Sequence, residues 1–75
     1  MSKQEIIDHY TKATKSQQDA ITRAAREWLR SKGIIVGRDS LHHWRNNPTP
    51  RSPLAPKYRQ AYAAAIRGIE AKQTA

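Results

Sequence analysis

The chain has 75 residues, no cysteine and a formal net charge of +8 at pH 7. This length allows one domain with a small core, and it disfavours an enzyme because little chain remains to enclose a catalytic cleft. The absence of cysteine excludes disulfides and thiolate zinc sites and favours a reducing, cytoplasmic setting. No apolar run approaches the ~18 residues that a membrane span needs. The basic excess makes a polyanion, above all nucleic acid, the expected partner.

The first predicted helix covers about residues 3–13. Ser2 and Glu5 match the S-x-x-E capping box, in which two side chains satisfy amide donors at a helix start. Three apolar residues then follow at the spacing of one helical stripe. They are Ile6, Ile7 and Tyr10. We expect this side of the helix to face the core.

The second predicted helix has the most regular apolar pattern. Ser16 and Asp19 repeat a capping pattern, so the helix is expected to begin near Ser16. Its apolar residues recur at i, i+3, i+4, i+7 and i+8, the spacing of a core-facing helix. They are Ile21, Ala24, Ala25, Trp28 and Leu29. The helix is expected to end at Lys32, because Gly33 supplies the left-handed residue on which many helices stop.

Residues 33–37, GIIVG, form a short apolar connector between two glycines. A brief strand is one interpretation, but the sequence offers no second β-rich segment with which it could pair. We therefore predict a buried turn. Its two outer apolar residues, Ile34 and Val36, are expected to insert into the core.

The third predicted helix lies within the segment VGRDSLHHWRNN. Leu41 and Trp44 are three residues apart, so they share one face of a helix and can anchor it to a core. The helix is expected to begin near Asp39, or one turn earlier if Gly37 caps it, and to end by Asn47. The end is set by the proline that follows, which disfavours a helical conformation in the residue before it.

The opposite side of this helix carries side chains that suit DNA recognition. Arg38, His42 and Arg45 follow a 4,3 spacing along one face. Arginine and asparagine pair with the edges of guanine and adenine in the major groove, and serine and histidine can contact bases or phosphates. Residues 34–59 also hold the densest basic excess, with five basic residues and one acidic residue. A solvated polar face explains the same pattern without any partner.

The last third of the chain predicts a stiff loop and a fourth helix. Residues 47–56 hold all four prolines and form an extended loop anchored by Leu54. The helix is expected to begin at Ala55 or Pro56, since proline suits a first turn. Its apolar stripe favours packing in the core over the stacking of tyrosines on exposed bases. The stripe is Tyr58, Tyr62, Ala65, Ile66 and Ile69.

Four helices with one apolar stripe each predict a compact all-α domain over residues 1–75, with 1–2 and 73–75 frayed. The pattern V-x-x-x-x-L-x-x-W-R-N resembles the recognition-helix segment of small phage Cro-like helix-turn-helix regulators. This resemblance implies that Val36, Leu41 and Trp44 are structural. It also implies that the polar residues of the segment contact DNA. These are Arg38, Ser40, His42, His43, Arg45 and Asn46.

The chain departs from that family pattern in the turn. Gly33 lies three residues before Val36 instead of next to it, and the small residues Ala24 and Ala25 lie about one turn too early. We therefore expect a helix-turn-helix-like unit with an extended turn. The alternative is that the two helices cross at another angle and the polar face serves a different surface.

Basic residues outside the third helix are candidates for phosphate contacts. Arg51, Lys57 and Arg59 flank the proline loop, and Asn47 adjoins it. Asn46 and Asn47 have an alternative role as caps at the end of their helix. Four basic residues of the second helix can meet phosphates or face solvent. They are Arg23, Arg26, Arg30 and Lys32.

The sequence therefore predicts a small, sequence-specific, double-stranded DNA-binding transcriptional regulator, such as a repressor, of phage or mobile-element type. It would act without catalysis or cofactor, as a possible homodimer on DNA, in the cytoplasm in association with a bacterial nucleoid. No membrane, small-molecule substrate or metal is expected, because the adjacent His42 and His43 point about 100° apart on a helix. The alternatives are a phage-encoded module that inhibits a host nucleic-acid enzyme, and a recombination directionality or RNA-binding accessory factor.

Overall fold

The computed structural model describes residues 1–46 and 53–74, of which 72–74 are described by their backbone alone. These residues form four α-helices and contain no β-strand. The helices are α1 (Lys3–Lys12), α2 (Lys15–Ser31), α3 (Arg38–Asn46) and α4 (Ala55–Thr74). The predicted all-α, four-helix domain is therefore confirmed.

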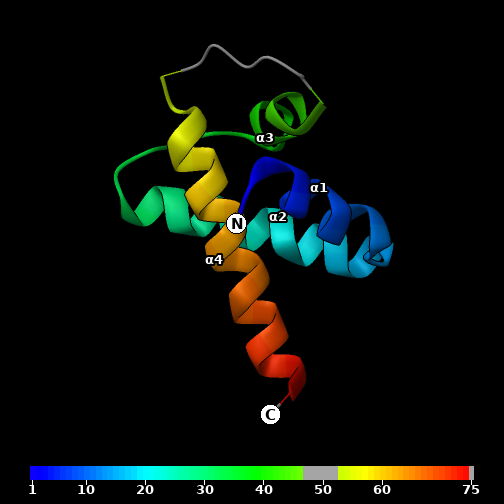
Figure 1. Cartoon of the computed structure of the whole chain (residues 1–75). Helices are drawn as coiled ribbons and strands as arrows, with labels where there is room; N and C mark the ends of the chain where they lie inside the picture. The colour runs from blue at the N-terminus through cyan, green and yellow to red at the C-terminus, as the bar shows by residue number, and fades with distance from the viewer. Residues whose placement is uncertain (47–52, 75) are drawn as a thin grey trace.

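Helix α4 is the long axis of the structure, and the other helices are arranged around its first half. The most extensive contact between helices is the one between α2 and α4, which cross each other (Figure 1), and α1 also packs against α4. Helix α3 lies at one end of the domain, beside the start of α4, and the C-terminal part of α4 extends away from the opposite end (Figure 1). The polar segment of interest is thus at one pole of the fold.

The starts of α1 and α2 are both fixed by capping boxes. The amide of Glu5 donates to Ser2 Oγ at 3.2 Å, which confirms the predicted box of α1. The cap predicted at Ser16 was wrong, because α2 begins two residues after Ala13 with Thr14 as its N-cap. The amide of Gln17 donates to Thr14 Oγ1 at 3.2 Å, and the Thr14 amide donates to Gln17 Oε1 at 3.0 Å. A complete box therefore forms upstream, and Ser16 lies inside the helix.

The end of α2 is a Schellman motif. Gly33 has φ +80°, and its amide donates to Arg30 O at 3.0 Å, while the amide of Ile34 donates to Leu29 O at 2.9 Å. The predicted end at Lys32, which is the C-cap, is confirmed. The left-handed backbone at Gly33 turns the chain away from α2 toward α3.

The connector that follows is partly buried. Ile34 and Val36 pack against the core as expected, but Ile35 between them is 87% exposed. Alternate residues of an extended segment point to opposite sides, which explains the pattern. The six residues 32–37 that join α2 to α3 are longer than the three- or four-residue turn of a standard helix-turn-helix. This is the extended turn that the sequence predicted.

Helix α3 is fastened to α4 by aromatic packing. Leu41 is 0% exposed and Trp44 is 3% exposed. The Trp44 ring stacks on Tyr62, with centroids 5.5 Å apart, and meets the edge of Tyr58 at 6.4 Å. The predicted burial of both tyrosines is confirmed, whereas Trp28, also expected in the core, is only partly buried at its margin. The two predicted anchors thus hold α3 by one face.

Candidate nucleic-acid interface

The outward side of α3 is polar and accessible. The helix begins at Arg38, directly after Gly37, and not at Asp39. Among the residues predicted to contact DNA, five in this helix are exposed. They are Arg38, Ser40, His42, His43 and Asn46. The exposed Asp39 stands among them in the first turn, where a carboxylate is favoured by the helix dipole.

Arg45 differs from the other polar residues of α3, because it is half buried and held against the protein. Its Cζ lies 3.7 Å from the ring centroid of Tyr10 on α1, and its Nε donates to Tyr62 Oη on α4 at 3.0 Å. Its Nη2 lies 3.2 Å from His42 Nδ1. The guanidinium therefore joins three helices instead of extending from α3 as the sequence spacing suggested.

The last turn of α3 is closed by its own side chains. Asn46 Nδ2 donates to His42 O at 2.9 Å, four residues earlier in the same helix. This bond ties the Asn46 side chain to the last turn of α3. A hollow of about 420 Å³ lies beside this turn and is bordered by α1, α2 and α3. Its lining includes Tyr10, Gln18, His42, Arg45 and Asn46.

Two further basic side chains are exposed near α3. Lys57 and Arg59 lie in the first turns of α4, which start at the same end of the domain as α3 (Figure 1). Lys3 was not predicted to belong to this region, but its Nζ lies 5.0 Å above the Trp44 ring. No local pattern could indicate this contact, because it depends on how α1 packs beside α3. Asn47 and Arg51 lie outside the described residues.

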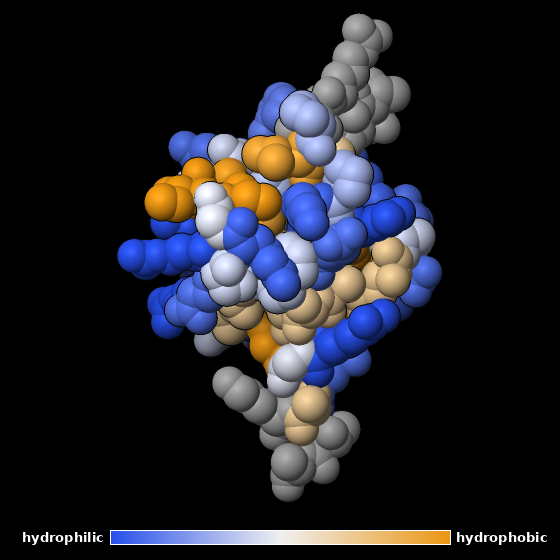
Figure 2. Space-filling view, turned by 90° about the vertical axis from the view of Figure 1, so that its left-hand side faces the viewer, coloured by the Kyte–Doolittle hydropathy of each residue, from blue (hydrophilic) through white to orange (hydrophobic). Residues whose placement is uncertain are grey.

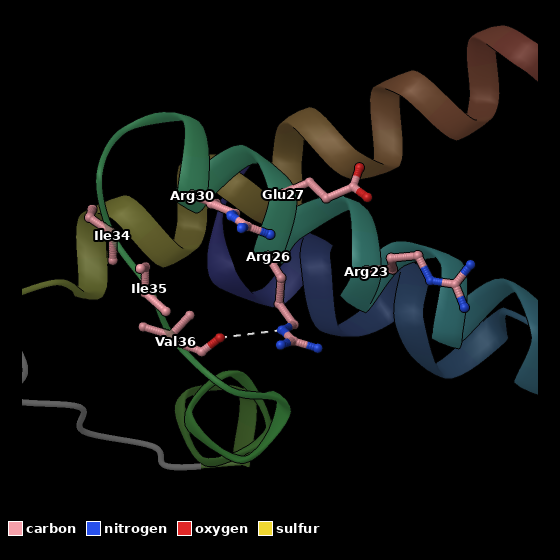
Figure 3. A pocket seen from close by; sticks show the side chains of 7 residues that line it. All are labelled: Arg23, Arg26, Glu27, Arg30, Ile34, Ile35 and Val36. Carbon is pink, nitrogen blue, oxygen red and sulfur yellow. Dashed lines mark hydrogen bonds between the residues drawn. The ribbon is translucent and has the colours of Figure 1, made fainter.

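Three basic residues of α2 line a pocket formed with the connector. Arg23, Arg26 and Arg30 are exposed, and with Glu27 they border an open pocket of about 400 Å³ whose other side is the connector. Figure 2 faces this side of the molecule and shows hydrophobic side chains at the surface beside hydrophilic ones. Arg26 Nε donates to Val36 O at 3.2 Å, so this arginine also ties the connector to α2 (Figure 3).

Among the described residues, Tyr62 is the one whose pKa departs clearly from its ordinary value. Burial raises the pKa of Tyr62 well above its ordinary value, and the positive charge of Arg45 opposes this shift only in part. Tyr62 therefore stays neutral near pH 7 and accepts from Arg45 without ionising. Among the described residues there is no group of three or more His, Asp or Glu side chains placed to hold a metal ion.

None of the helices, over the residues that the structure covers, has the length and apolar character needed to cross a membrane. No protein-family model matches the sequence, and comparison with curated proteins and with solved structures finds no match.

Proposed function

We propose that this chain is a small sequence-specific DNA-binding regulator that inserts α3 into the major groove. The supporting observation is the division of α3 into an anchored face and an exposed polar face. Leu41 and Trp44 are buried against the core, while five predicted contact residues remain exposed in a helix of nine residues. The major groove admits an α-helix, and such side chains match its donor and acceptor pattern. The net charge of +8 adds sequence-independent attraction to phosphates.

The exposed residues have separate roles in this proposal. Arg38 contacts base edges, because it is exposed in the first turn of α3 and the N-terminal part of the recognition helix meets the bases in helix-turn-helix proteins. His43, exposed in the last turn, is assigned to a phosphate. Asp39, whose negative charge is repelled by phosphates, accepts a hydrogen bond from a cytosine amino group and so contributes to base specificity. Lys57 and Arg59 contact phosphates from the start of α4.

Arg45 is assigned a positioning role instead of a direct base contact. Its Nε and Nη2 are engaged by Tyr62 and His42, and its plane lies on the ring of Tyr10. These contacts hold α3 at a fixed angle to α1 and α4. Arg45→Ala is therefore expected to weaken binding to all DNA sequences alike, because it changes how the whole helix is presented.

One helix of this length covers few base pairs, so the proposal includes a homodimer or several copies on one DNA site. Binding would repress or otherwise direct events at that site by occlusion or recruitment, without catalysis. A cytoplasmic protein associated with a bacterial nucleoid fits this role.

The test begins with selection of binding sites from random duplex DNA. Affinity for the selected site is then compared with affinity for scrambled DNA and for a hairpin RNA at two salt concentrations. Arg38→Ala is expected to lower the affinity for the selected site by about 1–3 kcal/mol and to relax the preference at particular base pairs. A selection without an enriched motif, or equal affinity for selected and scrambled DNA, would overturn the proposal.

Arg67→Ala is the matched control for this experiment. Arg67 is an exposed arginine in the C-terminal half of α4, and it follows the buried Tyr62 and Ile66 in the sequence. Its loss removes the same formal charge as Arg38→Ala. It is expected to weaken binding to every DNA sequence slightly and to leave base preference unchanged. If both variants lose affinity and preference equally, the charge of the protein and not the face of α3 determines binding.

A further inference from the structure

The connector between α2 and α3 leaves a large aliphatic side chain in solvent. Ile35 is 87% exposed, and no other large hydrophobic side chain in the described part of the chain is mostly exposed. Its neighbours Ile34 and Val36 are partly buried against the core. A single exposed isoleucine is common on protein surfaces, so Ile35 alone carries no conclusion. The surroundings of this residue are more informative.

Ile35 stands at the edge of a pocket with an apolar side and a basic side. The pocket has a volume of about 400 Å³ and is open to solvent. Residues of the connector form the apolar side and residues of α2 form the other, as Figure 3 shows. The lining residues are Ile34, Ile35, Val36, Arg23, Arg26, Glu27 and Arg30. In Figure 3 the guanidinium of Arg26 is directed toward Val36, while Arg23, Glu27 and Arg30 line the pocket at other positions along α2.

The two sides of the pocket are held at fixed positions. The Schellman motif around Gly33 fixes the start of the connector, and the bond from Arg26 Nε to Val36 O fixes its far end. A pocket held in this way needs little ordering when it binds a partner, and that reduces the entropic cost of association. Both sides of the pocket are therefore in position before a partner binds.

We infer that residues 34–36 with Arg23, Arg26 and Arg30 form a docking surface for an acidic segment of another protein, with one apolar side chain inserted beside Ile35. The apolar side chain would cover the exposed isoleucine. Carboxylates on both sides of it would pair with Arg23 and Arg30, whose planar groups suit such contacts, while Arg26 keeps its bond to Val36 O. This inference goes beyond the proposed DNA binding and uses residues outside the polar face of α3.

Charge and chemistry favour this occupant over two others. A nucleic-acid backbone would pair with the arginines, but it would leave Ile34, Ile35 and Val36 without an apolar partner and would meet Glu27. A second copy that presented this same pocket is disfavoured, because it would bring Arg23, Arg26 and Arg30 against their counterparts and like charges repel. An acidic segment with an apolar residue satisfies both sides of the pocket.

The test is a selection from a random-sequence peptide library against the whole chain, followed by synthesis of the selected peptide. We expect enrichment of an aliphatic or aromatic residue flanked by Asp and Glu. Ile35→Ser and Arg30→Glu should each weaken the binding of this peptide about tenfold or more, as for residues at the centre of an interface. Replacement of the peptide's acidic residues by lysine should abolish binding. Chemical shifts should change at residues 34–36 and along α2.

Arg67→Glu is the charge-matched control, since it makes the same change in net charge at an exposed position of α4. It is expected to retain peptide binding. Ile35→Ser is expected to fold normally because the side chain is exposed, and this is checked by its melting temperature.

Three results would overturn the inference. The first is a selection without an acidic and apolar pattern, or one whose winner binds Ile35→Ser unchanged. The second is concentration-dependent self-association that Ile35→Ser removes, which would make a second copy the occupant. The third is loss of DNA affinity in Ile35→Ser with peptide binding intact, which would assign the surface to DNA. Failure of the DNA selection described above would leave this peptide result unaffected, so the two proposals fail separately.

Discussion

Substitution of Tyr62 by phenylalanine isolates the hydrogen bond that fastens α3 to the rest of the domain. The ring of Tyr62 is fully buried and stacks on Trp44, and phenylalanine preserves this ring. The hydroxyl accepts from Arg45 Nε at 3.0 Å and is lost in the variant. Tyr62→Phe therefore removes one hydrogen bond with little change in volume.

The expected loss of stability follows from the charge and the exposure of the donor. A hydrogen bond to a charged group contributes about 1.5–3 kcal/mol. Arg45 is half buried and keeps its contact with the ring of Tyr10, so part of this contribution is recovered by water. We expect a decrease of about 1–2 kcal/mol in the free energy of unfolding, from a total of roughly 4–11 kcal/mol for 75 residues. The melting temperature should fall by about 4–16 °C.

Urea denaturation and thermal melting, both followed by circular dichroism, measure this loss. Tyr58→Phe is the matched control, because Tyr58 is buried on the same stripe but its hydroxyl has no hydrogen-bond partner among the described residues. Its expected effect is close to zero. The assignment of Arg45 as a fastening residue fails if Tyr62→Phe is as stable as the wild type, or if both variants lose the same amount.

Three other predictions concern stability. Thr14→Ala should cost about 1 kcal/mol because it removes the N-cap of α2, while Ser16→Ala should change stability little, and chemical denaturation distinguishes them. Gly33→Ala should destabilise the protein by about 1 kcal/mol or more, because Gly33 has φ +80°. Gly68→Ala, inside α4, should stabilise the protein by about 0.5–1 kcal/mol. No neighbouring atom lies within 4 Å of either added Cβ. The free energy of unfolding should also fall with rising pH because of Tyr62. In the unfolded chain the Tyr62 hydroxyl loses its proton near the ordinary pKa of 10.0, whereas burial keeps it protonated in the folded protein. The loss begins above about pH 10 at about 1.4 kcal/mol per pH unit, and it should be absent from pH titrations of the unfolding of Tyr62→Phe.

Much of the fold was predictable because each helix carries its own apolar period and its own end signals. The spacing of Leu41 and Trp44 predicts their shared burial, and Gly33 predicts the end of α2. The start of α2 was misplaced because two capping patterns overlap, at Thr14 and at Ser16. The sequence alone does not show that the Thr14 pattern forms both hydrogen bonds of a capping box.

The environment of the candidate site was less predictable because it depends on contacts between helices. Arg45 and His42 are three residues apart and were both predicted on the polar side of α3. Only Arg45 lies between the rings of Tyr10 and Tyr62. Those rings are brought there by α1 and α4, and helical periodicity does not specify which helices become neighbours. In the connector, by contrast, the expected insertion of Ile34 and Val36 agrees with their packing against the core, while Ile35 between them is exposed.

The formal charge of +8 counts every arginine equally, yet the structure gives them three different environments. Arg45 is packed between aromatic rings, Arg26 donates to the connector, and Arg38 and Arg59 are exposed. A guanidinium that already stabilises the fold cannot turn toward a phosphate without losing its intramolecular contacts. The number of phosphates that the protein can neutralise is therefore smaller than its basic composition suggests. Because counterion release scales with phosphates contacted, the salt dependence of DNA binding should reflect the exposed arginines and lysines near α3, not the net charge of the chain.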